Sequence, residues 1–104
     1  MPSSELSRVF CYVYVLYSEK SNNLYVGFTH DLRARLAKHN NGLNFSTKPY
    51  RPWSLIYYEA HTKESDAKRR ERYLKTTAGD RALRRMLREK LNGVKNLSRQ
   101  KVYY

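Results

Sequence analysis

Residues 9–28 (VFCYVYVLYSEKSNNLYVGF) decide the fold, because they hold two strand patterns joined by a polar turn. The run 9–17 is rich in β-branched and aromatic residues, which suit a half-buried pleated surface. The polar run 18–23 predicts a turn, and LYVGF at 24–28 predicts a second strand. We therefore expect an antiparallel hairpin.

Alternation along these strands predicts which side chains share a face of the sheet. Tyr12, Tyr14 and Leu16 should lie together on one face of the first strand, and Tyr25 and Gly27 together on one face of the second. A glycine inside a strand often marks a close approach to the backbone. We therefore expect an open place beside Tyr25 that suits a phosphate group.

Downstream of the hairpin the sequence predicts a helix, a third strand and two more helices. Thr29–Asp31 offer N-capping chemistry for a helix that ends near Asn40. Residues 41–52 hold one glycine and two prolines and predict a loop, and 53–59 (WSLIYYE) predict a strand. A helix should start near Thr62 and run to about Lys75, and Gly79 should break the helical pattern that follows. A last amphipathic helix should cover 80–91.

The order strand, strand, helix, strand, helix, helix predicts the α+β class, with a small three-stranded antiparallel sheet flanked by helices. We expect one domain over residues 9–91 and a basic, disordered C-terminal tail over 92–104.

Composition points to a polyanionic partner. The 104 residues suffice for one domain, and their net charge of +12 favours nucleic acid. No apolar run approaches the ~20 residues of a membrane-spanning helix. Cys11 is the single cysteine, which excludes a disulfide framework or a thiolate zinc cage. The polar start (MPSSE) lacks a signal-peptide pattern, so we expect a cytoplasmic location.

Two polar residues interrupt the apolar stripe of the first helix. Leu32, Arg35, Leu36 and His39 are spaced i, i+3, i+4 and i+7, so they share one face. The leucines should pack on the sheet and carry Arg35 and His39 inward. The alternatives are an arginine that snorkels at the edge of the stripe and a histidine that is satisfied near a helix end.

A carboxylate lies on the stripe of the next helix. Ala67, Arg70, Glu71 and Leu74 share a face by the same spacing. A carboxylate on the core side must be paired or must hold a cation. The alternative to a functional role is an ordinary ion pair between Glu71 and Lys75 or an arginine.

Together these residues resemble the GIY-YIG endonuclease family, and most closely its short stand-alone bacterial members. Tyr12–Tyr14 (YVY) and Tyr25–Gly27 (YVG) are similar to the two tyrosine motifs, and residues 67–75 (AKRRERYLK) to the helix with the metal-binding glutamate. The first motif lacks its glycine, Phe28 stands where some branches have a lysine, and an asparagine used by certain branches has no counterpart before Asn92.

The resemblance implies a set of site residues and one cofactor. Tyr14, Tyr25, Arg35, His39 and Glu71 would be catalytic, and Glu71 would also be the single metal ligand, for one Mg²⁺ or Mn²⁺ ion. The metal would act as Lewis acid, Arg35 would stabilise phosphoryl charge, and a tyrosine, helped by His39, would activate water. Which tyrosine has that role is left open.

The basic surface predicts the partner. Residues 63–90 contain eleven Lys/Arg and only five Asp/Glu, and this excess of positive charge favours contact with nucleic-acid phosphates. We expect nucleic-acid contacts from Lys48, Arg51, Arg69, Arg72 and Lys75.

Three functions agree with this surface. The first is a metal-dependent endonuclease, structure- or strandedness-selective, in DNA repair or processing, with DNA the more expected substrate than RNA. The second is a non-catalytic nucleic-acid-binding module. The third is a basic ribosome-associated protein, in which Glu71 would only form an ion pair. The inward carboxylate favours the first.

Overall fold

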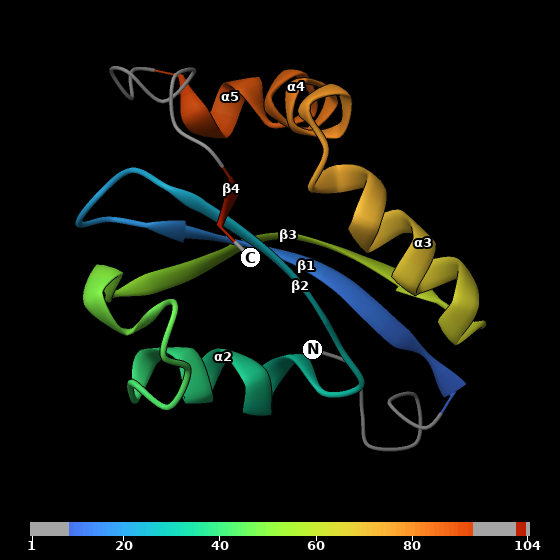
Figure 1. Cartoon of the computed structure of the whole chain (residues 1–104), viewed down its shortest axis with the longest axis horizontal. Coiled ribbons are helices and arrows are strands. Elements are labelled where there is room, and N and C mark those ends of the chain that lie inside the picture. The colour runs from blue at the N-terminus through green and yellow to red at the C-terminus, as the bar shows by residue number, and fades with distance from the viewer. Residues whose placement is uncertain (1–8, 93–101, 104) are drawn as a thin grey trace.

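The computed structural model describes residues 9–92 and 102–103, and its elements follow the expected order. In Figure 1 the chain runs through β1 (Cys11–Ser18), β2 (Leu24–Thr29), α2 (Leu32–Asn40), the short 3₁₀ helix η1 (Lys48–Tyr50), β3 (Trp53–His61), α3 (Glu64–Leu74), α4 (Thr77–Met86), α5 (Arg88–Leu91) and β4 (Val102–Tyr103). The described part contains no helix that is long and apolar enough to cross a membrane.

The strand β1 is the centre of the sheet. It pairs antiparallel with β2 on one side and with β3 on the other, so that Tyr14 lies opposite Gly27 and Tyr58. The predicted α+β fold with a three-stranded antiparallel sheet is therefore confirmed. A short addition was not predicted: β4 pairs in parallel with β2 at Leu24 and Tyr25.

Helices cover both faces of the sheet. Figure 1 shows α2 below the sheet and α3, α4 and α5 above it. The upper layer packs on an aliphatic core, formed by Cys11, Val13, Val15, Leu24, Val26, Ala67, Leu74, Leu83 and Leu91. The lower layer packs on an aromatic core, formed by Tyr12, Tyr14, Leu16, Tyr25, Leu32 and Trp53. The two sets alternate along β1 and β2 as the period of a strand requires.

The prediction that Gly79 breaks a helix is wrong. Gly79 lies inside α4, and the break falls at Lys75 and Thr76. Thr76 caps α4, because its Oγ1 accepts a hydrogen bond of 3.0 Å from the Gly79 amide. A Cβ atom on Gly79 would lie 1.9 Å from the Tyr73 carbonyl oxygen. Glycine is therefore needed for the close approach of α4 to the end of α3.

The prediction of one continuous last helix over 80–91 is also wrong. The structure has two helices, α4 and α5, separated by Leu87, whose backbone (φ −104°, ψ 18°) leaves the helical region. Leu83, Leu87 and Leu91 contact the aliphatic core, but Met86 is 47% exposed. Of the expected tail, residues 93–101 and 104 lie outside the described residues, so its predicted disorder stays a prediction.

Gly79→Ala should destabilise the protein, although alanine is the better helix former by about 1 kcal/mol. The added methyl group collides with backbone, so we expect the free energy of unfolding to fall by roughly 2 kcal/mol or more. Urea denaturation measures this change. A gain in stability would show that the helix junction relaxes without strain.

Candidate active site

A hydrogen-bonded relay lies between the sheet and α2. The Tyr14 hydroxyl is 2.9 Å from His39 Nε2, and His39 Nδ1 is 2.8 Å from Thr47 Oγ1. The Thr47 hydroxyl donates to the Asn44 carbonyl oxygen over 3.4 Å, so it accepts from His39. Nδ1 therefore carries the proton of the neutral ring, and Nε2 accepts the hydrogen bond that Tyr14 donates. His39 is thus positioned as a proton acceptor for Tyr14.

The sequence builds this relay through α2. Asp31 caps the helix by accepting a hydrogen bond of 3.0 Å from the Ala34 amide. Leu32 anchors the first turn in the aromatic core. Two turns later His39 is fully buried, so α2 delivers an imidazole to the sheet.

Tyr25 completes the aromatic floor of the site. Its ring centroid lies 4.9 Å from that of His39 and 6.2 Å from those of Tyr14 and Trp53. The side chain is 8% exposed. The Tyr25 hydroxyl also interacts with the Asn44 side chain, which comes from the loop before η1.

The ionisable groups are kept neutral by burial. Burial, followed by the positive charge of Arg35, lowers the pKa of His39 to about 4. Burial raises the pKa of Tyr14 and of Tyr25, and Arg35 opposes that rise in both. At neutral pH both phenols therefore keep their protons, and His39 is an uncharged acceptor.

Arg35 lies at the centre of this group. Its side chain is half-buried, and its Nη1 donates a long hydrogen bond of 3.4 Å to the Phe28 carbonyl oxygen. It also interacts directly with the Tyr14 hydroxyl. The guanidinium is thus held among neutral aromatic groups, where its charge acts on Tyr14, Tyr25 and His39.

Glu71 approaches the same tyrosines from the opposite layer. Its charge adds to the burial that raises the pKa of Tyr25 and of Tyr14, so it lies within electrostatic reach of both phenols. The side chain is 20% exposed, and Oε2 accepts a hydrogen bond of 2.8 Å from Lys75 Nζ. The ion pair that was the alternative reading of Glu71 is therefore present beside the site.

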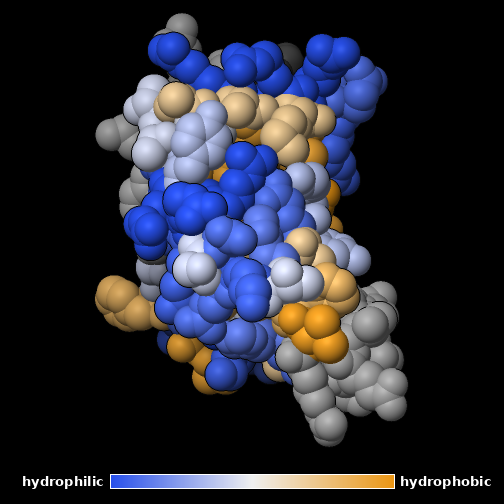
Figure 2. All heavy atoms as spheres, turned by 90° about the vertical axis from the view of Figure 1, so that its right-hand side faces the viewer, coloured by the Kyte–Doolittle hydropathy of each residue, from blue (hydrophilic) through white to orange (hydrophobic). Residues whose placement is uncertain are grey.

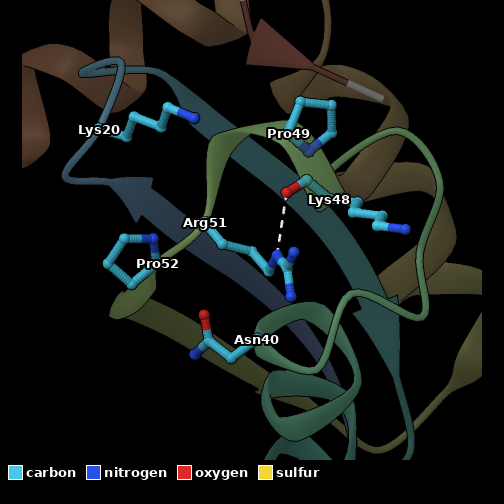
Figure 3. A pocket seen from close by; sticks show the side chains of 6 residues that line it. All are labelled: Lys20, Asn40, Lys48, Pro49, Arg51 and Pro52. Carbon is cyan, nitrogen blue, oxygen red and sulfur yellow. Dashed lines mark hydrogen bonds between the residues drawn. The ribbon is translucent and has the colours of Figure 1, made fainter.

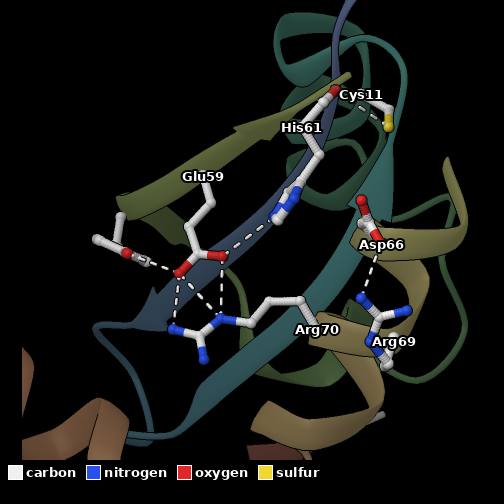
Figure 4. A network of polar contacts seen from close by, with 7 residues as sticks. Cys11, Glu59, His61, Asp66, Arg69 and Arg70 are labelled. Atoms are coloured by element: carbon white, nitrogen blue, oxygen red, sulfur yellow. Dashed lines mark hydrogen bonds and ion pairs between the residues drawn. The ribbon is translucent and has the colours of Figure 1, made fainter. Parts of the chain in front are cut away.

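A partly buried ion pair links the helix that carries Glu71 to β3. Arg70 Nε and Nη2 bind both oxygens of Glu59 on β3 at 2.9–3.1 Å, as Figure 4 shows. Tyr57 also donates to Glu59 at 2.8 Å, and the His61 ring lies 3.2 Å away. Burial opposes ionisation of Glu59, but these bonds outweigh it and lower its pKa. The bidentate contact sets the rotation of α3 and thereby the direction of Glu71.

The space beside Gly27 is filled by the protein itself. A Cβ atom on Gly27 would lie 2.4 Å from the Tyr14 ring. The close approach predicted from the glycine is real, but the group that approaches is Tyr14. The expected open phosphate floor at this position is therefore wrong.

The expected nucleic-acid contacts fall into two regions. Lys48 and Arg51 line a hollow beside α2, whereas Arg69, Arg72 and Lys75 lie on α3 or at its end. Arg69 pairs with Asp66 at 2.7 Å, Lys75 pairs with Glu71, and Arg72 is exposed. Figure 2 shows that the face carrying α3 is mostly hydrophilic, with apolar atoms at its margins. The structure does not gather these five cations into one patch.

One carboxylate matches the modest ligand set that Mg²⁺ takes from a protein. Among the described residues no group of three or more His, Cys, Asp or Glu side chains could hold a metal ion. Mg²⁺ is usually bound through one or two carboxylates, with water and substrate phosphates as the other ligands. Glu71, partly exposed and within electrostatic reach of two phenols, fits that role, and a bound cation would compete with Lys75 for its oxygens.

Three supporting residues were missed by the sequence reading. Thr47 fixes the His39 tautomer, Asn44 reaches Tyr25, and Glu59 orients α3. Thr47 and Asn44 lie in the segment interpreted only as a loop. Their polarity gave no signal there, because loops are rich in such residues.

Comparison with known proteins defines the class. Residues 10–84 match the GIY-YIG catalytic domain family, so this chain belongs to the GIY-YIG family, a nuclease superfamily. The predicted resemblance to this family is thereby confirmed.

The relatives that this chain resembles include UPF0213 proteins of staphylococci. The chain is 40% identical to that of Staphylococcus haemolyticus over 74 residues, 70% of this chain and 89% of the relative. It is 44% identical to one of Staphylococcus epidermidis over 64 residues, 59% of this chain and 78% of the relative. It is 36% identical to that of Staphylococcus saprophyticus over 74 residues, 70% and 89% of the two chains. No solved structure matches.

Burial of neutral His39 predicts a pH-dependent stability. The pKa of His39 in the folded protein, about 4, lies below the ordinary 6.5, so the unfolded chain binds the proton more readily. Neutral His39 therefore contributes fully to the free energy of unfolding above pH 6.5, and this contribution is lost as the pH falls toward 4. Between pH 6.5 and 5 we expect a loss of about 2 kcal/mol, before most carboxylates titrate. Urea unfolding at each pH, compared with His39→Gln, isolates this term. Parallel curves for the two proteins would contradict the assignment.

Proposed function

We propose that this chain is a divalent-metal-dependent endonuclease that hydrolyses phosphodiester bonds of nucleic acid, DNA rather than RNA. It would select its substrate by structure or strandedness and act in DNA repair or processing. The observation that supports this most directly is that Arg35 and Glu71, from opposite layers, both act on Tyr14 and Tyr25. A binding module needs no carboxylate whose charge acts on two neutral phenols.

Arg35 would bind the scissile phosphate. Its guanidinium is positioned among uncharged rings, where its field is weakly screened. It would contact a phosphoryl oxygen and stabilise the negative charge that builds there as water attacks. When a metal ion is bound at Glu71, it would act as Lewis acid on the phosphate and assist the leaving oxygen.

Tyr14 is the phenol we assign to water activation. It alone of the two tyrosines donates a hydrogen bond to the unprotonated nitrogen of His39. As the attacking water loses a proton to the Tyr14 oxygen, Tyr14 would pass its own proton to His39 Nε2, whose basicity the negative charge of the bound phosphate would raise. The water oxygen would then form a bond to phosphorus as the bond to the leaving sugar oxygen breaks. The leaving oxygen would take up a proton from solvent, and His39 would release its extra proton to solvent.

A cleavage assay tests this proposal. Labelled single-stranded, duplex and branched DNA and RNA are incubated with Mg²⁺ or Mn²⁺, using wild type, Glu71→Gln and Glu64→Gln. Glu64 is the matched control, since it is an exposed glutamate on the same helix, paired with His30 and Lys68. We expect Glu71→Gln to lose cleavage by at least about 100-fold and to keep binding, with Glu64→Gln unaffected.

The same assay decides the alternative function. The Glu71–Lys75 ion pair is the observation that favours a non-catalytic module. If all three proteins bind nucleic acid equally and none cleaves any substrate with either metal, the nuclease proposal fails and the binding module replaces it.

A further inference from the structure

We propose that a basic hollow beside the relay is a second subsite, which binds a phosphate of the substrate strand adjacent to the cleaved bond. The inference rests on the proposed function and names where the flanking nucleotide is held. The hollow has a volume of about 550 Å³ and is lined by Lys20, Asn40, Lys48, Pro49, Arg51 and Pro52. This volume is in the range of small-ligand sites.

The hollow is a preformed junction of three segments. Lys20 comes from the β1–β2 turn, Asn40 ends α2, and the remaining residues belong to η1 and the stretch before β3 (Figure 3). The Asn40 amide donates to the Trp53 carbonyl oxygen at 2.9 Å and accepts from the Trp53 amide at 2.7 Å. The Glu19 amide donates to the Pro52 carbonyl oxygen at 3.2 Å. These bonds hold the walls without a ligand.

Its lining charge is entirely positive. The six lining residues include two lysines and an arginine but no carboxylate. Within residues 9–92, none of the ion pairs involves Lys20, Lys48 or Arg51. Three cations without acidic partners repel one another, and an anion between them relieves that repulsion.

Arg51 is arranged to receive a phosphate. Its Nε donates to the Lys48 carbonyl oxygen at 3.0 Å, which fixes the plane of the guanidinium. Figure 3 shows this group between Lys48 and Asn40. The two Nη atoms remain for a bidentate contact, which suits a phosphate. The rings of Pro49 and Pro52 add apolar walls for a sugar or a base.

The hollow and the relay are built from the same two chain segments. Asn40 follows His39 in the chain, and Lys48 follows Thr47, while His39 and Thr47 are joined by the 2.8 Å hydrogen bond. A strand whose scissile phosphate lies at Arg35 would therefore place a neighbouring nucleotide over this surface.

Binding measured in the non-cleaving Glu71→Gln background separates this inference from the proposed chemistry. We compare Lys48→Gln/Arg51→Gln with Arg33→Gln/Lys38→Gln, which removes one exposed arginine and one exposed lysine of α2 that do not line the hollow. For single strands each lost phosphate contact lowers the salt slope of log K by about 0.7. We expect a drop of roughly 1.4 and at least tenfold weaker binding for the hollow variant only.

Oligonucleotide length locates the effect. The loss should appear with single strands of eight nucleotides and vanish with dinucleotides, which cannot span both subsites. Equal losses in the two double variants, or a loss that persists with dinucleotides, would overturn the subsite. Unchanged thermal unfolding of both variants confirms that folding is intact.

A second inference rests on an independent observation, the two apolar side chains exposed on the loop over 41–47. Phe45 is 93% exposed and Leu43 is 71% exposed. The loop is nonetheless ordered by its own bonds, since the Ser46 amide and hydroxyl donate to Asn44 Oδ1 at 3.1 and 2.8 Å. Both ends of the loop adjoin residues of the basic hollow. We infer that Phe45 stacks on a nucleobase of the bound strand.

An abasic substrate tests this stacking. In the Glu71→Gln background we expect Phe45→Ala to weaken binding of an eight-nucleotide strand by about tenfold and Phe45→Trp to retain it. An abasic strand should bind wild type and Phe45→Ala alike. Met86→Ala, at an exposed apolar residue of α4, serves as the control. An equal effect of Phe45→Ala on normal and abasic strands would overturn the inference.

Discussion

The hydrogen bond between Tyr14 and His39 is the contact on which the site depends. It joins the central strand to α2, and through Thr47 it continues to the loop that leads into η1. Each polar atom in this buried series has a partner, so burial strengthens the bonds instead of penalising them. The same burial keeps His39 neutral, which is the state that can accept a proton. Burial therefore accounts both for the strength of these hydrogen bonds and for the neutral state of His39.

The sheet divides the site between two layers. Tyr14, Tyr25, Arg35 and His39 belong to the aromatic side, whereas Glu71 is carried by the helix that packs on the aliphatic side. The Glu59–Arg70 contact gives α3 a fixed rotation on the sheet, and Gly79 allows α4 to close against the end of α3. Residues far from the chemistry therefore determine where the carboxylate lies.

Most of the fold could be predicted from the sequence because the patterns of apolar residues were periodic. Alternation along 9–28 separated the two cores, and the spacing of Arg35 and His39 placed both on the inner stripe of α2. Gly79 was misread because a glycine signals a helix break as readily as a close contact, and only the neighbouring Tyr73 carbonyl decides between them. The same ambiguity affected Gly27, whose neighbour is Tyr14. Thr47, Asn44 and Glu59 could not be found from pattern, since their partners lie in other elements.

The separation of the loop and the hollow from the two cores has a consequence for substitutions during evolution. The loop over 41–47 and the hollow beside it lie outside both cores, apart from the buried Thr47 that supports His39. Substitutions at Phe45, Lys48 or Arg51 therefore leave the packing of the sheet intact, whereas substitutions at Tyr14 or His39 disturb folding and chemistry together. A lineage of such small domains can accordingly exchange the residues of the proposed subsite, while the proposed reaction centre stays constrained by the stability of the fold itself.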